Sequence, residues 1–153
     1  MKLPIVHKYV EILQGIKNNL ILAPTGNLGI PRDSMPQIDH KHRADFLAWL
    51  KDHGVKSREI RVPAKSLKMA QGEYNRDKVG AIVDSGNVGG DPIFVSKDGY
   101  VIDGNHRLIA HLNLPGAGSY IRVCELGLET KALLELIHSY PNVRYRNLNN
   151  FAS

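Results

Sequence analysis

The residues with the clearest capacity for chemistry stand together at Asp103, Gly104, Asn105, His106 and Arg107. A glycine between a β-rich run and a helical run allows a sharp turn, so the first free amides of the next helix belong to residues 105–107. Unpaired N–H groups and a partial positive charge at a helix N-terminus favour a phosphate group. Arg107 would add a planar, permanently charged fork, and Asp103 stands where a metal ligand or a helix cap would stand. The sequence therefore predicts an anion site at this turn.

A β-hairpin is predicted directly before the turn. Lys97-Asp98-Gly99 separates two runs rich in β-branched and aromatic residues within 91–103, and Asp-Gly between such runs is a hairpin signal. The helix that starts at the turn should end at Asn113-Leu-Pro115, because proline cannot continue a helix. The candidate anion site therefore lies between a hairpin strand and a helix.

Hydrophobic periodicity and breaker residues predict the remaining elements. We expect helices over 5–19, 40–53 (capped by Asp39, with Phe46, Leu47 and Leu50 facing a core), 74–83 and 129–139, strands over 59–63 and 120–124, and connections over 23–36, 64–70 and 84–90. The sum is a small α+β domain with a mixed β-sheet flanked by helices. Residues 1–56 would form a helical N-terminal extension packed on the core, residues 57–141 the core, and residues 142–153 a polar C-terminal tail.

Two segments resemble the motifs of a known superfamily. Asp103-Gly-Asn-His-Arg-Leu-Ile-Ala110 is similar to the Gly-x-His/Arg-Arg-x-x-Ala box of the ParB/sulfiredoxin superfamily. Val62-Pro-Ala-Lys-Ser-Leu67, followed by Gln71-Gly-Glu73 and Lys78-Val79, resembles the family's opening of strand, Leu-x-Pro-x-Gln-x-Glu and helix. The match covers roughly residues 59 to 124, with both boxes in the family's order.

The resemblance implies a ParB/sulfiredoxin-like domain that binds ATP or another nucleotide and carries out Mg²⁺-dependent phosphoryl chemistry, either NTP hydrolysis or phosphotransfer. Glu73 would orient the nucleophile, and His106 and Arg107 would complete the catalytic set. Asp103 and Glu73 would hold the magnesium ion. The nucleotide would be bound by Gly104, Asn105, His106, Arg107, Lys65, Ser66 and Gln71, with Lys68 on the same linker.

Each of these residues also has a purely structural interpretation. Gly104 would then serve only as a turn, Asp103 as a cap, and Arg107 as an ion-pair partner of Glu125 or Glu73. Asp39-His40-Lys41-His42 predicts no zinc site, because histidines two apart on a helix do not share a face.

The chain departs from the family's pattern at positions that argue against two of the family's known activities. Sulfiredoxins place a catalytic cysteine where this chain has Asn105, so sulfinic-acid repair is not expected. Partition-type ParB proteins continue into a helix-turn-helix and a dimerisation domain, for which the 153-residue chain has no room after Cys124.

Cys124, the single cysteine, lies in an apolar run and is expected to be a buried packing residue. One cysteine also excludes an intramolecular disulfide and fits a cytoplasmic protein.

Net charge leaves two further interpretations open. The chain has a net charge of +5, and residues 32–78 hold 11 lysines and arginines against 7 acidic residues. The same phosphate pocket with this basic face would suit a ParB-like DNA nuclease or DNA-binding protein. A non-enzymatic phage- or plasmid-type protein that binds a host partner through its N-terminal third is the third interpretation. No apolar run approaches a membrane span, so no membrane partner is expected.

Overall fold

The computed structural model describes residues 28–70, 76–85, 90–113 and 120–145. The helix predicted over 5–19 lies outside these ranges, as do Gln71 and Glu73.

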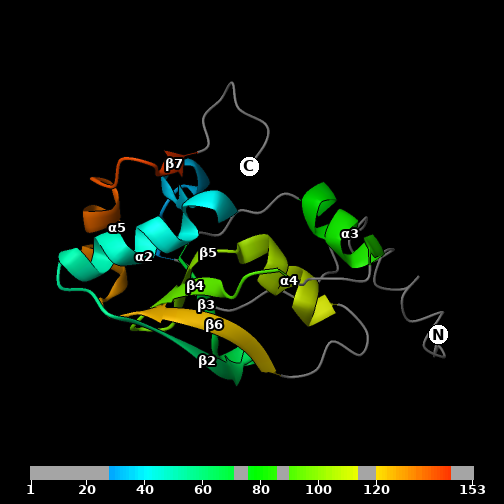
Figure 1. Ribbon diagram of the computed structural model, residues 1–153. Helices are drawn as coiled ribbons and strands as arrows, with labels where there is room; N and C mark the ends of the chain where they lie inside the picture. Colours follow the sequence, from blue (N-terminus) through cyan, green and yellow to red (C-terminus); the bar gives the residue numbers. More distant parts are fainter. Residues whose placement is uncertain (1–27, 71–75, 86–89, 114–119, 146–153) are drawn as a thin grey trace, which may run out of the picture.

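A mixed five-stranded sheet forms the centre of the molecule (Figure 1). Its strands lie in the order β2 (Ser57–Pro63), β6 (Tyr120–Leu126), β4 (Ile93–Ser96), β5 (Tyr100–Asp103) and β3 (Lys68–Met69). The β2–β6 and β4–β5 pairs are antiparallel, whereas the β6–β4 and β5–β3 pairs are parallel. The prediction of an α+β domain with a mixed sheet is therefore confirmed.

Helices α2 (Arg43–Asp52) and α5 (Thr130–Ile137) cover one face of this sheet and lie together at one end of the molecule (Figure 1). Phe46 and Leu50 of α2 are completely buried there, as predicted, and Leu47 is partly buried against them. The core on this face consists of Phe46, Leu50, Val55, Phe94, Ile102, Cys124, Leu126, Leu133, Ile137 and Tyr140. The described part of the N-terminal segment thus shares a core with the sheet.

The opposite face of the sheet packs against α4 (Asn105–Asn113) and the 3₁₀ turn η3 (Ala64–Ser66). Successive residues of a strand point to opposite faces, which is why Phe94 belongs to the first core and its neighbours to the second. This second core consists of Ala64, Leu67, Ile93, Val95, Val101, Leu108 and Val123. Helix α3 (Arg76–Ser85) lies beside α4 at the end of the molecule away from α5 (Figure 1).

The predicted hairpin and the helix after it are confirmed. Gly99 adopts φ +86° between β4 and β5, and its N–H donates to the Ser96 carbonyl at 3.0 Å. The Asp98 carboxylate in this turn accepts hydrogen bonds from the Thr130 N–H (3.0 Å) and hydroxyl (2.8 Å) at the start of α5. The hairpin therefore also fixes the position of a helix far along the chain.

Two predicted connections and the predicted C-terminal tail contain short regular elements that the sequence patterns do not indicate. The connection before residue 40 includes η1 (Arg32–Ser34) and β1 (Pro36–Gln37), and η3 and β3 lie in the connection at 64–70. Residues 144–145, which we expected in a polar tail, form β7 (Arg144–Tyr145) and pair antiparallel with β1. A two-residue strand has too little sequence for a pattern, and Pro36 is tolerated because it begins a strand at a sheet edge.

The predicted role of Asp39 as a helix cap is wrong. Asp39 does stand before η2 (His40–His42), which leads into α2, but its side chain makes no capping hydrogen bond. Its carboxylate instead accepts hydrogen bonds from Nε (3.1 Å) and Nη2 (2.8 Å) of Arg144. The Arg144 bond also holds the pKa of Asp39 below its ordinary value. This ion pair ties β7 to the start of η2.

None of the helices in the described part of the chain has the length and apolar character that crossing a membrane requires.

Candidate functional site

The turn that begins α4 requires glycine for a structural reason. Gly104 adopts φ +116°, and a Cβ at this position would lie 2.4 Å from Cγ2 of Ile93 and 2.7 Å from its Cβ. Both the backbone conformation and the contact with β4 exclude a larger side chain. The Leu108 N–H donates to the Gly104 carbonyl at 3.0 Å, so α4 starts where the sequence predicted. Close approach of a phosphate is therefore not needed to explain this glycine.

Asp103 lies at the end of β5, and its carboxylate oxygen Oδ2 accepts the Ile38 N–H at 2.9 Å. Burial raises the pKa of this carboxyl, although the Ile38 bond and the charges of Arg107 and Lys78 oppose that shift. A carboxyl group whose pKa is higher in the folded than in the unfolded protein lowers the free energy of unfolding at pH values at which the unfolded chain is ionised. This loss of stability disappears as the pH falls and the group becomes protonated in both states. The fold thus retains an ionisable carboxyl that weakens it at neutral pH.

Arg107 extends from the first turn of α4 and donates a hydrogen bond from its guanidinium group to the Asp91 carbonyl. The side chain is half-buried, and burial lowers its pKa against the opposing charges of Asp103 and Asp91. Of the two ion-pair partners that we considered for Arg107, Glu73 lies outside the described residues. The other, Glu125, is instead bonded to Nε of Arg58 at 3.0 Å. The side chain of Arg107 is thus directed toward the loop before β4.

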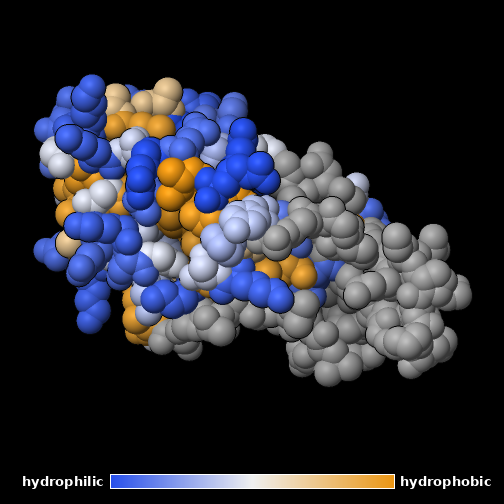
Figure 2. Space-filling model, turned by 90° about the horizontal axis from the view of Figure 1, so that it is seen from below, coloured by the Kyte–Doolittle hydropathy of each residue, from blue (hydrophilic) through white to orange (hydrophobic). Residues whose placement is uncertain are grey.

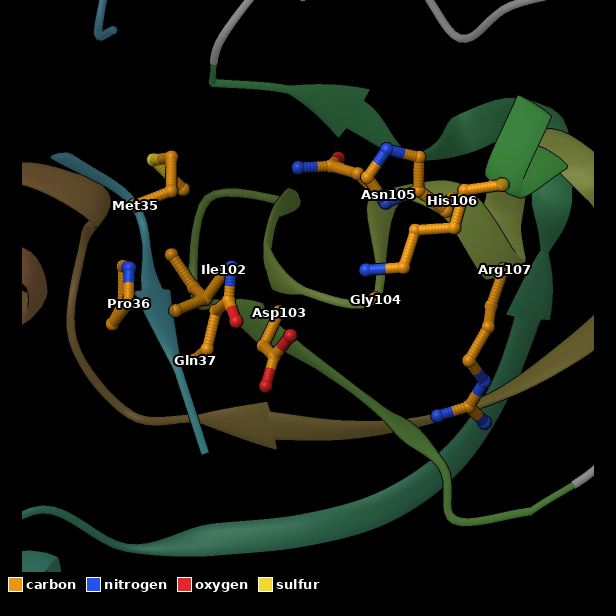
Figure 3. Close-up of a pocket in the computed structure, with 10 residues that line it drawn as sticks. Met35, Pro36, Gln37, Ile102, Asp103, Gly104, Asn105, His106 and Arg107 are labelled. Atoms are coloured by element: carbon orange, nitrogen blue, oxygen red, sulfur yellow. The ribbon is translucent and has the colours of Figure 1, made fainter. Parts of the chain in front are cut away.

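The predicted turn residues line a first cavity of about 170 Å³ between β1, α3 and α4, which we call the Asn105 cavity. In Figure 3 the Asn105 and His106 side chains lie on one side of the turn at Gly104, and the Arg107 side chain extends the other way. The cavity is lined by Met35, Pro36, Gln37, Lys78, Ile102, Asp103, Gly104, Asn105, His106 and Arg107. Five residues that the sequence analysis singled out are therefore neighbours in one hollow.

Two further cavities share Arg107 with the first. The Arg43 cavity, of about 210 Å³, is lined by Ile38, His40, Arg43, Asp91, Pro92, Ile93, Phe94, Asp103, Gly104 and Arg107. The Tyr120 cavity, of about 270 Å³, is lined by Arg61, Gly90, Asp91, Pro92, Arg107, His111, Tyr120, Ile121 and Arg122. Arg107 consequently stands where the three hollows meet.

Two buried polar atoms at these cavities have no hydrogen-bond partner among the described residues. One is Oδ1 of Asn105, a residue with only 7% of its surface exposed, and the other is Nη2 of Arg43. The Arg43 guanidinium carbon lies 4.2 Å from the centre of the Phe94 ring, which holds the group beside Arg107. Buried polar groups are nearly always bonded in folded proteins, so these two atoms identify places where a ligand would be stabilised.

The other residues that we expected to bind phosphate do not line these cavities, as far as the structure describes them. Lys65 and Ser66 are exposed on η3 and line none of the three cavities, and the Ser66 hydroxyl donates to the Pro63 carbonyl at 2.7 Å. The amine of Lys68 lies 4.6 Å from the centre of the Tyr100 ring. Because Gln71 and Glu73 lie outside the described residues, their predicted roles remain predictions.

The described part of the chain offers few side-chain ligands for a magnesium ion. No cluster of three aspartate, glutamate, histidine or cysteine side chains occurs there. In the Asn105 cavity Asp103 is the lone carboxylate, one of its oxygens accepts the Ile38 N–H, and Lys78 and Arg107 line the same hollow. Mg²⁺ prefers several oxygen ligands, so this set fits an anion better than a metal.

No protein-family model, no curated protein and no solved structure matches this chain.

Proposed function

We propose that this chain binds ATP or another nucleotide by its phosphates and carries out phosphoryl chemistry on it, by hydrolysis or by transfer. The observation that carries this proposal is the meeting of Arg43 and Arg107 in one cavity, with Nη2 of Arg43 buried and unbonded among the described residues. Two guanidinium groups in a partly buried hollow offer planar, charge-assisted hydrogen bonds to phosphate oxygens. Such bonds are stronger there than in water.

The remaining lining favours a nucleotide over a free phosphate ion. The Asn105 cavity adds an unbonded acceptor, Oδ1 of Asn105, which a sugar hydroxyl or a base amine would satisfy. Each cavity is smaller than the roughly 300–1,000 Å³ of most ligand pockets, so a nucleotide would have to span two of them through Arg107. A ligand with phosphates at one end and donor groups at the other fits that arrangement.

Magnesium enters this proposal only as a companion of the nucleotide. Among the described residues, Asp91 and Asp103 are the carboxylates that line the Arg43 cavity, and one oxygen of each is already bonded, to His40 and to the Ile38 N–H. Phosphate oxygens would therefore have to supply most of the ligands of the ion. A ParB/sulfiredoxin-like fold is part of the same proposal. The strand, glycine turn and helix that the resemblance implies correspond to β5, Gly104 and α4, which supports it.

Calorimetric titration with ATP, ADP and CTP in the presence of Mg²⁺ tests the proposal. We expect saturable binding of at least one nucleotide, and Arg107→Ala should weaken it. The loss of a hydrogen bond to a charged group corresponds to about 1.5–3 kcal/mol, or roughly 10- to 100-fold in affinity. Arg58→Ala is the matched control, because Arg58 is an exposed arginine bonded to Glu125 and lines none of the three cavities.

The outcome of Arg107→Lys shows whether the guanidinium fork matters beyond its charge. We expect this variant to bind more weakly than the wild type, because an ammonium group cannot bind phosphate in a bidentate manner. The proposal is wrong if none of the three nucleotides binds to the wild type, or if Arg107→Ala binds as tightly as Arg58→Ala does.

A second candidate function, the binding of single-stranded nucleic acid, is favoured by a feature of the sheet edge. Arg61 of β2 and Arg122 of β6 stand directly opposite each other, both exposed, and neither side chain forms a hydrogen bond or ion pair with another described residue. Like charges in this position destabilise a sheet, and a phosphate backbone would relieve the repulsion. Tyr120, which is 52% exposed in the same cavity, would stack on a base. Figure 2 views the side of the molecule on which β2 and β6 lie, where hydrophilic and hydrophobic residues intermingle.

Binding of a labelled single-stranded oligonucleotide at several salt concentrations tests this second function. If this function is correct, the Arg61→Ala/Arg122→Ala double variant should bind the oligonucleotide more weakly. The slope of the logarithm of the binding constant against the logarithm of the salt concentration should also fall, by the amount that about two lost phosphate contacts predict. Calorimetry with mononucleotides should be unaffected by the double variant. Equal oligonucleotide binding by the wild type and the double variant would exclude this surface.

The protein-partner interpretation depends on the N-terminal third, much of which lies outside the described residues.

A further inference from the structure

A histidine and an aspartate that are far apart in the sequence form a pair at the rim of the Arg43 cavity. Nδ1 of His40, in η2, lies 2.5 Å from Oδ2 of Asp91, in the loop before β4. The His40 side chain is 85% exposed and that of Asp91 30% exposed, and both residues line the cavity with Arg43 and Arg107. The pair therefore faces the hollow in which we place the phosphates.

Asp91 is held from two directions. Its carboxylate binds His40, while its backbone carbonyl accepts a hydrogen bond from the Arg107 guanidinium. The hydrogen bond from His40 also keeps the pKa of the Asp91 carboxyl below its ordinary value, so the carboxylate is an ionised acceptor. Asp91 thus fixes the imidazole relative to a phosphate-binding arginine.

An ionised carboxylate at Nδ1 determines what the other ring nitrogen does. The carboxylate only accepts hydrogen bonds, so the imidazole proton resides on Nδ1, and Nε2 of the neutral ring has a free lone pair. The same division of roles orients the histidine of hydrolytic triads, in which the carboxylate fixes the tautomer and the outer nitrogen accepts a proton. His40 is therefore equipped to act as a general base.

We propose that His40 is the general base of a hydrolytic reaction in which the terminal phosphate of a nucleoside triphosphate in the Arg43 cavity is released, with Asp91 as its positioning residue. This inference rests on the proposed nucleotide binding. The oxygen of a water molecule attacks the terminal phosphorus, and the bond from that phosphorus to the bridging oxygen breaks. The water proton passes to Nε2 of His40 and then to solvent. The products are inorganic phosphate and the nucleoside diphosphate.

The two arginines of the cavity have a different role in this reaction. Their positive charges would stabilise the negative charge on the equatorial oxygens and on the leaving phosphate, which is where most of the catalysis of phosphoryl transfer arises. His106, which the resemblance implied as a catalytic residue, lines the Asn105 cavity and not the Arg43 cavity. Within the described residues His40 is thus the histidine that adjoins both arginines.

The test separates binding from turnover. Binding of ADP with Mg²⁺ is measured by calorimetry, and release of inorganic phosphate from ATP or CTP is measured as kcat and KM. We expect His40→Gln to bind ADP as the wild type does while its kcat falls by about 10²- to 10⁴-fold, the usual contribution of a general base. Asp91→Asn should lower kcat with KM unchanged, since its backbone carbonyl still binds Arg107. His42→Gln, two residues away and outside the three cavities, should change neither quantity.

The possible results of these measurements separate failure of the general-base role from failure of nucleotide binding. If His40→Gln keeps the kcat of the wild type, or if the wild type binds nucleotide without releasing phosphate above the buffer rate, the inference is overturned while the proposed binding function stands. If Asp91→Asn raises KM and leaves kcat unchanged, Asp91 belongs to binding and the positioning role is wrong. If the wild type binds no nucleotide, the proposed function and this inference fail together.

Discussion

Replacement of Gly104 by alanine is expected to destabilise the protein severely. The new methyl group would overlap Ile93, whose Cγ2 and Cβ atoms lie 2.4 and 2.7 Å from the position of a Cβ at residue 104. Overpacking of this kind costs about 1–3 kcal/mol. The φ of +116° adds strain, since sparsely populated backbone conformations cost about 1–3 kcal/mol in residues other than glycine. The two effects act at the junction of β5 and α4, so the candidate site should be lost together with stability.

Gly54→Ala is the control that separates these two contributions. Gly54 also has a positive φ, +82°, but nothing lies within 4 Å of the position of its Cβ. Urea denaturation of both variants should show a much larger loss in the free energy of unfolding for Gly104→Ala. Equal losses would mean that Ile93 yields to the methyl group and that backbone strain alone requires the glycine.

Local sequence patterns predicted the elements around this glycine correctly. The Asp-Gly turn at 98–99, the helix start at Asn105 and the core residues Phe46 and Leu50 all depend on residues close together in the chain. For such features the periodicity of strands and helices, together with turn chemistry, is sufficient. The proposal of an anion site at residues 103–107 rests on the same kind of local signal, a glycine followed by a helix start, and it stays a prediction.

The contacts that complete the candidate site are not local. His40 and Asp91 are 51 positions apart, and Arg43 reaches Arg107 from another element. In the sequence, Arg43 resembles any arginine on an exposed helix face, and nothing in its neighbours indicates a buried guanidinium atom. Tertiary packing alone decides that η2 and the first turn of α2 lie against the loop before β4. A prediction from one sequence therefore finds the turn but not its partners.

The described part of the N-terminal segment, residues 28–56, contributes to both the core and the candidate site. Its helix α2 supplies a central core residue, Phe46, and a residue that lines the Arg43 cavity, Arg43 itself. Arg43 is held against the Phe94 ring, and Phe94 is in turn in contact with Phe46. The geometry of the cavity thus depends on the packing of α2 against β4.

Phe46→Ala is the second substitution for which we expect a large effect. Phe46 is fully buried, and its ring lies 5.2 Å from that of Phe94 and 5.1 Å from that of Tyr140, measured between ring centres. Removal of a buried phenylalanine side chain costs about 3–5 kcal/mol, because its burial is lost and a cavity remains. The variant should also bind nucleotide more weakly, since Phe94 would no longer hold Arg43 in place.

Trp49, the single tryptophan, makes the measurement specific to α2. Its fluorescence reports the unfolding of that helix, whereas far-ultraviolet circular dichroism reports the whole chain. If α2 and the sheet are one cooperative unit, both signals should shift to lower urea by the same amount in Phe46→Ala. Leu47→Ala, at a partly buried neighbour, should cause a smaller shift, and Phe46→Leu replaces the alanine variant if the latter has no folded baseline. A shift of the fluorescence transition alone would show that α2 unfolds independently, and Arg43 would then belong to a separable extension.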